Sequence, residues 1–393
     1  MIAIRVYYRP DKVVETTSGE AFIRIGDQKH RLSADEKREL RIAKGEIEYE
    51  KEPVQLQWPG DFDQLLVRDF SDQYVAKRSL ETAHTREDIL CLNHLGRFVS
   101  GQFVPNLACC LLFASDPRSV IPGARVRFMR FEGREERSGA AYNAVKDVFF
   151  DGPVPLQIRD AEQFILSQIR NFTRLGADGR FYTRPEYPRD VWLEAIVNAC
   201  AHRSYNLKNM LTYIKMFDDR IVFESPGGFP PPTTAENIYD IHNPRNPHLM
   251  NAMFYLDFVK CAHEGTRRMR DMMAEANLPG PEFIQKQIGT HQVHVILRNN
   301  IEARKVFVDE DAINVIGKAI FETLSDDERM IINYIAEKGH MNVSDANRLL
   351  HRDWRTAKSK LEGLVAKGVL IRRSRTGKKQ DPSQRYVLKR RTT

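Results

Sequence analysis

The sequence predicts a mixed α/β (α+β) chain that folds as more than one domain. Three observations support this prediction. The chain has 393 residues, and an ordinary domain holds about 150. Segments with the apolar spacing of strands alternate with segments that have the spacing of helices. Basic residues are concentrated in the last seventy positions, which sets this part apart from the rest.

The composition indicates a globular protein of a reducing compartment. Hydrophobic residues make up 42% of the chain and charged residues 29%, which excludes a disordered or collagen-like chain. The longest apolar run, Leu107–Ala114, is far shorter than the ~18 residues of a membrane helix, and the first residues lack the apolar block of a signal peptide. Five cysteines without a CxxC pair do not suggest a disulfide framework or a zinc site. We therefore expect a cytoplasmic protein without membrane contact.

Residues 1–55 form a β-rich first segment. Ile2–Tyr8 alternates in the manner of a strand, and Ala21–Ile25 follows a turn signal as a second strand. Ser33 is expected to begin a charged helix, because Glu36 stands three residues later and completes a capping box.

Residues 60–180 form a mixed α/β middle region. The continuous apolar run Leu107–Phe113 is typical of a buried strand, and Ala124–Phe131 alternates apolar residues with arginines as a second strand. Apolar residues at helical spacing predict three helices, at Asp69–Lys77, Thr85–Leu95 and Asp160–Leu175.

Residues 185–298 form the next module, and residues 299–323 a connector. Two strands, Asn209–Phe217 and Arg220–Ser225, are joined by a two-residue turn and predict a hairpin. A proline- and glycine-rich loop follows, which is incompatible with a helix or an inner strand. The remaining elements are helices at Arg189–Arg203, Pro247–Lys260 and Gly265–Asn277 and a strand at Gln292–Leu297.

The order of elements in residues 324–393 is typical of a winged helix-turn-helix. Ser325 caps a first helix, Asp326–Glu337. A short helix, a longer helix and a hairpin follow, at Val343–Leu350, Asp353–Lys367, and Val369–Arg373 with Arg385–Lys389.

The charge of this last segment favours DNA as its partner. It holds 17 Lys and Arg against 8 Asp and Glu, whereas the other 323 residues hold 43 against 45. Basic side chains on a helix and a wing can meet phosphates and guanine edges, although winged helices also dock proteins, so a protein partner remains the alternative. The candidate DNA contacts are Arg352, Arg355, Lys358, Lys360, Arg372, Arg373, Arg375, Lys378 and Lys379.

A polar stripe follows the helix predicted in the 185–298 module. Within LEAIVNACAHRSYN, the residues Glu194, Asn198 and His202 are spaced four apart and share one helix face. An amide oxygen is a hard metal ligand and a carboxylate can orient water, so the stripe suits a magnesium–nucleotide site. On spacing alone, a structural stripe bonded to a neighbouring loop is the more common explanation.

Two further loops favour the nucleotide site. The stretch ESPGG ends a strand at Gly227 and Gly228, which allow the backbone to approach a ligand closely. The stretch AHEGTRRMRD leads through Gly265 into a helix N-terminus, where free N–H groups bind phosphate and Arg267 and Arg268 add positive charge.

These segments resemble a known family when they are taken together. LEAIVNACAHRSYN, FDDRIVFESPGGFP, HNPRNP and HEGTRRMRDMM look like the ATP-binding module described as RecG-C-terminal-like, a divergent relative of the gyrase/Hsp90/histidine-kinase/MutL (GHKL) ATPases. The resemblance implies a two-layer sandwich over residues 185–298, without helicase motor motifs. AFIRIGDQKHRLSADEKREL, in residues 1–52, resembles the end of a Schlafen/AlbA-type domain, although Glu15 and Glu20 do not match its nuclease pattern.

The resemblance implies a role for each residue of the site. Asn198 would ligate magnesium, and Glu194 would be the general base of a weak ATPase. Other residues would hold ATP: Gly227 and Gly228 at the adenine, Gly265 and Thr266 at the phosphates, together with His202 and Arg267. The chain departs from the wider superfamily because ESPGG lacks the aspartate that reads adenine and the phosphate loop has a single glycine. A retained fold with a repurposed pocket therefore stays open.

Three functions fit these features. The leading hypothesis is an ATP-responsive DNA-binding regulator of prokaryotic transcription or defence, in which nucleotide sets a conformation or a homodimer. The second is a nucleic-acid-processing ATPase, or the ATPase subunit of a nuclease complex. The third is a scaffold whose ATPase-like fold and winged helix both bind protein partners.

Overall fold

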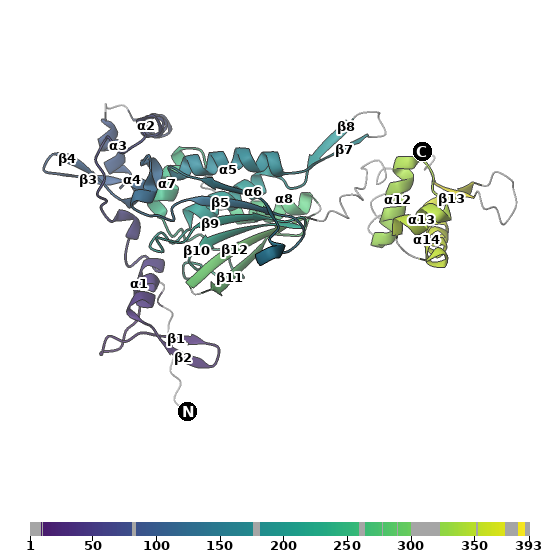
Figure 1. Ribbon diagram of the computed structural model, residues 1–393, viewed down its shortest axis with the longest axis horizontal. Coiled ribbons are helices and arrows are strands. Elements are labelled where there is room, and N and C mark those ends of the chain that lie inside the picture. Colours follow the sequence, from purple (N-terminus) through teal and green to yellow (C-terminus); the bar gives the residue numbers. More distant parts are fainter. Residues whose placement is uncertain are drawn as a thin grey trace. The chain divides into compact units, whose positions relative to one another are not determined.

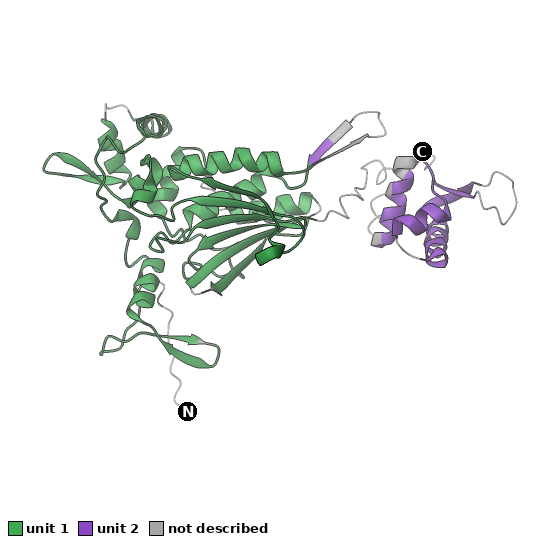
Figure 2. Cartoon of the chain, viewed as in Figure 1, with its two compact units in different colours: residues 1–170, 185–299 green, residues 171–184, 300–393 purple. Residues whose placement is uncertain are grey.

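The computed structural model describes residues 9, 11–80, 84–175, 181–258, 264–276, 278–288, 290–299, 323–350, 353–373 and 384–389. These residues fall into two compact units (Figure 2). The first unit contains residues 1–170 and 185–299, and the second contains residues 171–184 and 300–393. Helices and strands carry the labels of Figure 1.

The first unit begins with a hairpin and a capped helix. Strands β1 (Phe22–Ile25) and β2 (Gln28–Arg31) pair antiparallel, and α1 spans Ala34–Ala43. The hydroxyl of Ser33 accepts a hydrogen bond from the Glu36 N–H while the Glu36 carboxylate accepts one from the Ser33 N–H, which confirms the capping box. The strand expected at residues 2–8 lies outside the described residues. The Schlafen/AlbA resemblance of this segment stays a prediction.

The run Leu107–Phe113 is a helix, α4, so the predicted strand is wrong. Asn106 begins this helix because its side chain accepts a hydrogen bond from the Cys109 N–H. Every residue of α4 is buried, and an apolar run that is buried on all sides has no periodicity that distinguishes helix from strand. No helix in the described ranges has both the length and the apolar character needed to cross a membrane.

Helices α2, α3 and α7 surround α4. They span Gln64–Arg78, Arg86–Leu92 and Pro247–Tyr255, and both α2 and α4 contact α7. A small hairpin, β3 (Gly96–Val99) and β4 (Gln102–Pro105), connects α3 to α4. The carboxylate of Glu50 accepts hydrogen bonds from the His248 and Leu249 N–H groups, which caps the start of α7. The N-terminal helices therefore share one core with the module expected at 185–298.

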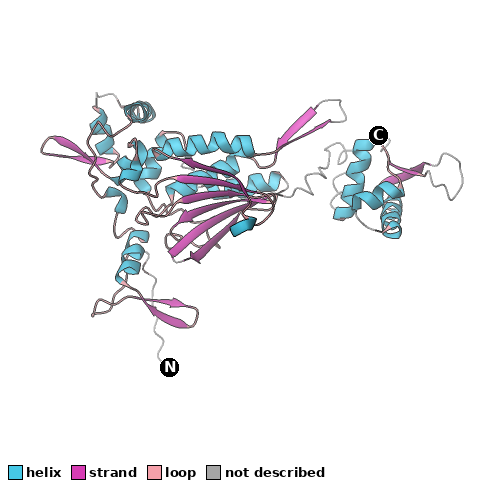
Figure 3. Cartoon of the chain, viewed as in Figure 1, coloured by secondary structure: helices cyan, strands magenta, loops and turns pink. Residues whose placement is uncertain are grey.

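A six-stranded mixed sheet, ordered β11-β12-β10-β9-β5-β6, forms the centre of the first unit (Figure 3). The pairing of β5 with β9 is parallel, and all the other pairings are antiparallel. Helices α5 (Val154–Gln168) and α6 (Arg189–Ala201) pack on it, so the unit is an α+β fold with a layer of helices against a sheet. The strands are β5 (Val126–Phe131), β6 (Ala144–Phe150), β9 (Thr212–Met216), β10 (Arg220–Pro226), β11 (Glu282–Ile288) and β12 (Thr290–Arg298).

Two details of the sheet layer differ from the sequence prediction. The helix expected at Asp160–Leu175 ends at Gln168, because Ile169 adopts an extended conformation and β7 (Asn171–Leu175) follows and pairs with β8 (Phe181–Pro185). Strand β11, which the sequence analysis does not include, adds an edge to the sheet. The region predicted as a separate domain at 60–180 supplies β5 and β6 to the sheet.

The C-terminal part of the second unit contains three helices and a pair of strands. They are α12 (Asp326–Lys338), α13 (Val343–Leu350), α14 (Trp354–Ala366), β13 (Leu370–Arg373) and β14 (Arg385–Leu388). Ser325 caps α12 as expected, and Met341 pairs with Tyr386 of β14. The described elements have the predicted bounds to within one residue. The assignment of this unit as a winged helix stays a prediction.

We expect truncation of α4 to destabilise the first unit strongly. Leu111 is completely buried, so Leu111→Ala should lower the free energy of unfolding by roughly 2–5 kcal/mol. Leu65 on α2 is 64% exposed, so Leu65→Ala should change it by less than about 0.5 kcal/mol. Denaturant unfolding of both variants measures the difference, and equal losses would contradict the buried position of α4.

Candidate functional site

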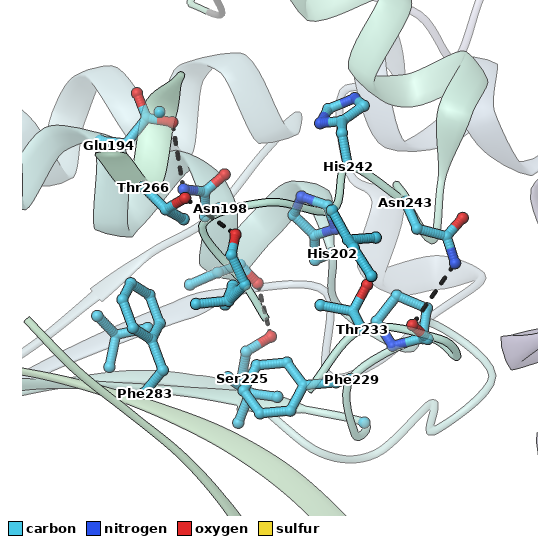
Figure 4. Close-up of a pocket in the computed structure, with 18 of the residues that line it drawn as sticks. Glu194, Asn198, His202, Ser225, Phe229, Thr233, His242, Asn243, Thr266 and Phe283 are labelled. Carbon is cyan, nitrogen blue, oxygen red and sulfur yellow. Dashed lines mark hydrogen bonds between the residues drawn. The ribbon is translucent and has the colours of Figure 1, made fainter. Parts of the chain in front are cut away.

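A pocket lies in the first unit between α6, the turn after β10 and the start of α8 (Gly265–Glu275) (Figure 4). Its cavity volume, counted as the space open to the centres of water-sized molecules, is about 150 Å³. One water needs roughly 10–15 Å³ on this measure, so a small ring system with substituents fits. Apolar side chains from β10, β11 and β12 form its floor, among them Phe223, Phe283, Val293 and Val295.

The polar stripe of α6 faces this pocket. Glu194, Asn198 and His202 all line it, because positions four apart share a helix face. The Asn198 Nδ2 donates to Glu194 Oε1 at 3.2 Å, so the amide oxygen of Asn198 is not used in this bond. The opposite faces of α6 carry buried Trp192, Ile196 and other apolar residues.

The start of α8 lies directly against Glu194. A Cβ on Gly265 would lie 2.2 Å from Glu194 Oε1, so only glycine permits this approach without moving the carboxylate. Arg268, one turn further along α8, donates to Glu194 Oε2 at 2.6 Å. Thr266 lines the pocket and donates its hydroxyl to the Ile238 carbonyl.

The glycine turn after β10 forms the other end of the pocket. Gly227 has a φ of +99°, a conformation that side chains disfavour, and its Cα lies close to Ser204. Ser225 lines the pocket beside it and donates its hydroxyl to the Ala199 carbonyl of α6. Figure 4 places Phe229, which follows the glycines, away from Glu194.

A single loop fixes the positions of these walls. In the segment HNPRNP, Asn243 donates to the Pro231 carbonyl at 2.7 Å and Arg245 donates to the Gly228 carbonyl at 2.7 Å. Asn246 is buried and donates to the carbonyls of Ala201 and Arg203, just after the stripe of α6. The loop therefore connects the proline-rich segment, the glycine turn and the end of α6.

Burial changes the charge state of the groups around the pocket. Burial, aided by the neighbouring His242 and Arg245 side chains, lowers the pKa of His202 to about 4, so its ring is neutral at pH 7. Burial also lowers the pKa of Arg245 to about 10. The charged side chains among the described lining residues are two carboxylates, Glu194 and Glu264, with no lysine or arginine.

The donor set of the pocket fits magnesium better than zinc. The described residues contain no cluster of three or more His, Cys, Asp and Glu side chains that could hold a metal ion alone. Magnesium is usually held by one or two protein oxygens together with waters and phosphates. The Asn198 amide oxygen and the nearby Glu194 carboxylate supply oxygens of this kind.

The structure gathers seven of the eight sequence-predicted nucleotide residues around one pocket. They are Glu194, Asn198, His202, Gly227, Gly228, Gly265 and Thr266. The eighth, Arg267, does not line it; its guanidinium is 48% exposed and pairs with Asp240.

Sequence reasoning gave no role in this site to His242, Asn243 or Glu264, and it assigned ATP binding to Arg267 and not to Arg268. The spacing of buried Met269 and Met273 marks the inner face of α8, and Arg268 borders this face.

The comparisons with known proteins agree with an ATPase-like fold. The family model described as "Putative ATP-dependent DNA helicase recG C-terminal" matches residues 212–297, so the chain contains an ATPase-like domain. This range includes the glycine turn and α8, whereas α6 precedes it. A search of the curated proteins finds no match. The crystal structure of the DIP2311 protein from Corynebacterium diphtheriae is similar in fold, with a TM-score of 0.52, 19% identity, and coverage of 95% of this chain and 71% of that one.

We expect His202 to make the stability of the first unit depend on pH. Its pKa is about 4 in the folded protein, against 6.5 for an unperturbed histidine, so its contribution is complete above pH 6.5 and is lost as the pH falls towards 4. His202→Gln should reduce the dependence of the free energy of unfolding on pH between these values. Part of the dependence should remain, because the pKa of buried His294 is also about 4.

The control for this measurement is His30→Gln, since the His30 side chain is 43% exposed. Denaturant midpoints at pH 7, 5.5 and 4.5 give the profiles. An unchanged profile in His202→Gln would contradict the buried neutral ring.

Proposed function

We propose that this protein is an ATP-responsive DNA-binding regulator whose nucleotide pocket is the one lined by α6 and α8. One observation carries the proposal: Glu194 and Asn198 face a glycine turn and the N-terminal end of a helix across a single pocket. The N–H groups at the end of a helix attract phosphate, and glycines let the backbone reach a ligand. The family match over residues 212–297 supports a nucleotide as the ligand.

Each wall of the pocket has a part in this proposal. Gly227, Gly228 and the neighbouring Phe229 border the base, and the start of α8 at Gly265 and Thr266 meets the phosphates. The Asn198 amide oxygen holds magnesium, which would neutralise phosphate charge when bound. The stretch ESPGG, which contains Ser225, resembles the loop in which the wider superfamily reads adenine with an aspartate, and it has no aspartate. The Ser225 hydroxyl is engaged with Ala199, so we expect weak selection among bases.

The second unit supplies the proposed DNA contacts. Arg355 and Lys358 on α14 and Arg373 on β13 are exposed, and none of the three forms an ion pair with a described carboxylate. Lys360 and Arg372 are already paired, with Asp327 and Glu362 respectively. The other candidates, Arg352, Arg375, Lys378 and Lys379, lie outside the described residues. A helix with exposed basic side chains near its N-terminus suits the major groove.

The alternative of an ATPase rests on one group, the Glu194 carboxylate beside Asn198. A general base must reach the water that it activates. Because both oxygens of this carboxylate already accept hydrogen bonds, we favour a regulator that binds nucleotide over an enzyme that turns it over rapidly.

We expect magnesium-dependent ATP binding that depends on Asn198. Asn198→Ala removes the proposed metal ligand and should raise the Kd for Mg-ATP about 10-fold or more. Asn251→Ala, at an exposed asparagine of α7, is the control and should bind normally. Isothermal calorimetry measures both. An absence of heat with the unaltered protein would rule out the nucleotide proposal.

We also expect salt-dependent binding of duplex DNA through α14. The double variant Arg355→Ala/Lys358→Ala should weaken binding at all sequences and lower the slope of log K against log salt by roughly 2. Lys360→Ala should change this slope less, because the Lys360 ammonium lies 3.6 Å from Asp327. Fluorescence anisotropy at several salt concentrations measures the slopes. If the protein does not bind DNA at low salt, the regulator hypothesis is wrong and the protein-scaffold hypothesis takes its place.

A further inference from the structure

The carboxylate of Glu194 is held on both sides. Arg268 Nη2 lies 2.6 Å from Oε2, and Asn198 Nδ2 lies 3.2 Å from Oε1. The Glu194 side chain is 15% exposed and the Arg268 side chain 34%, so this ion pair stands at the border between pocket and solvent. It is also a contact between α6 and α8, two helices that pack against each other.

The charges of the pocket alone do not suit a triphosphate. The described lining contains two carboxylates, Glu194 and Glu264, and no lysine or arginine. Arg268 is therefore the described cation that is bonded directly to a lining carboxylate. A guanidinium is a planar fork of donors that binds phosphate oxygens as well as it binds a carboxylate.

The neighbouring arginines of α8 point elsewhere. Arg267 pairs with Asp240, and Arg270 pairs with Asp271 and lies over the ring of Tyr239. Successive residues of a helix are rotated by about 100°, so Arg268 shares a face with Gly265, three positions earlier, while Arg267 and Arg270 do not.

The position of Arg268 along the pocket selects the phosphate that it can reach. The glycine turn and Phe229 form the end that we assign to the base, and Glu194 with Gly265 forms the other end. A nucleotide that lies between them presents its terminal phosphate to the Glu194 end. Arg268 is within hydrogen-bond distance of this carboxylate, so its guanidinium lies at the end where the terminal phosphate would be.

We propose that Arg268 is the terminal-phosphate sensor of the pocket and that its ion pair with Glu194 is a latch which ATP opens and ADP leaves closed. This inference rests on the proposed nucleotide function. When the terminal phosphate is present, the Arg268 guanidinium moves from Glu194 to the phosphate, and the Glu194 carboxylate becomes free. The latch thus gives the contact between α6 and α8 two states that depend on the nucleotide.

Calorimetry with Mg-ADP and with a magnesium complex of a non-hydrolysable ATP analogue tests the sensor. Arg268→Ala should raise the Kd for the ATP analogue about 10-fold or more and change the Kd for ADP by less than about 2-fold. Arg268→Lys keeps the positive charge but loses the planar fork of donors. Its Kd for the ATP analogue should therefore lie between the values for the wild type and for Arg268→Ala. Arg270→Ala removes the same charge two positions further along α8, on another face of the helix, and should change neither Kd.

A second variant tests the latch from the opposite side. Glu194→Gln removes the charge that holds Arg268, so it should raise the affinity for the ATP analogue relative to the affinity for ADP a few-fold, whatever it does to magnesium binding in both complexes. A residue needed only for structure would weaken both ligands. Equal effects of Arg268→Ala on the two ligands, or an unchanged or lower affinity for the ATP analogue relative to ADP in Glu194→Gln, would overturn the inference and leave the nucleotide function standing. A wild-type protein that binds neither ligand would overturn both.

Discussion

The pocket depends on one short loop whose polar side chains each hold a different wall. Asn243 holds the proline-rich segment, Arg245 the glycine turn and Asn246 the end of α6. Water cannot replace a buried hydrogen-bond donor. The loss of one of these side chains would therefore leave backbone carbonyls without a partner and lower the stability of the fold. The Nε and Nη1 of Arg245 are themselves buried without a hydrogen-bond partner, which costs stability. Buried polar groups of this kind are more common at functional sites than in ordinary cores.

Different kinds of contact hold the two ends of the pocket in place. The glycine turn is fixed by the buried Arg245 guanidinium, which donates to the Gly228 carbonyl. The Glu194 end is fixed by an ion pair and an amide, which a charged ligand can displace. In the proposed function, the base would lie at the end fixed by Arg245 and the phosphates at the end fixed by the ion pair.

Much of this architecture follows from local sequence signals. The capping residues Ser33 and Ser325 begin their helices as predicted, and the four-residue spacing of Glu194 and Asn198 brings them to one pocket. Local signals do not predict secondary structure correctly where it depends on contacts between residues far apart in the sequence. The helix α4 is buried on every side and so has no amphipathic pattern.

The choice between Arg267 and Arg268 shows the same limit at the level of one residue. Both follow the same glycine and carry the same charge, and only the rotation of α8 against α6 decides which one reaches Glu194. Strand β11 and the joining of β5 to the 185–298 module are likewise set by sheet pairing, which the sequence order does not reveal.

The parallel pairing of β5 with β9 has a consequence for synthesis on the ribosome. Residues 126–130 can pair with residues 212–216 only after the latter have been synthesised. Pairings between residues that are far apart in the sequence are slow to form. Until then, the apolar faces of β5 and α5 lack their cover and are open to association with other chains. A fragment that begins at residue 185 would lack β5 and expose the edge of β9. We therefore expect the ATPase-like segment not to fold by itself, even though its sequence can be recognised alone.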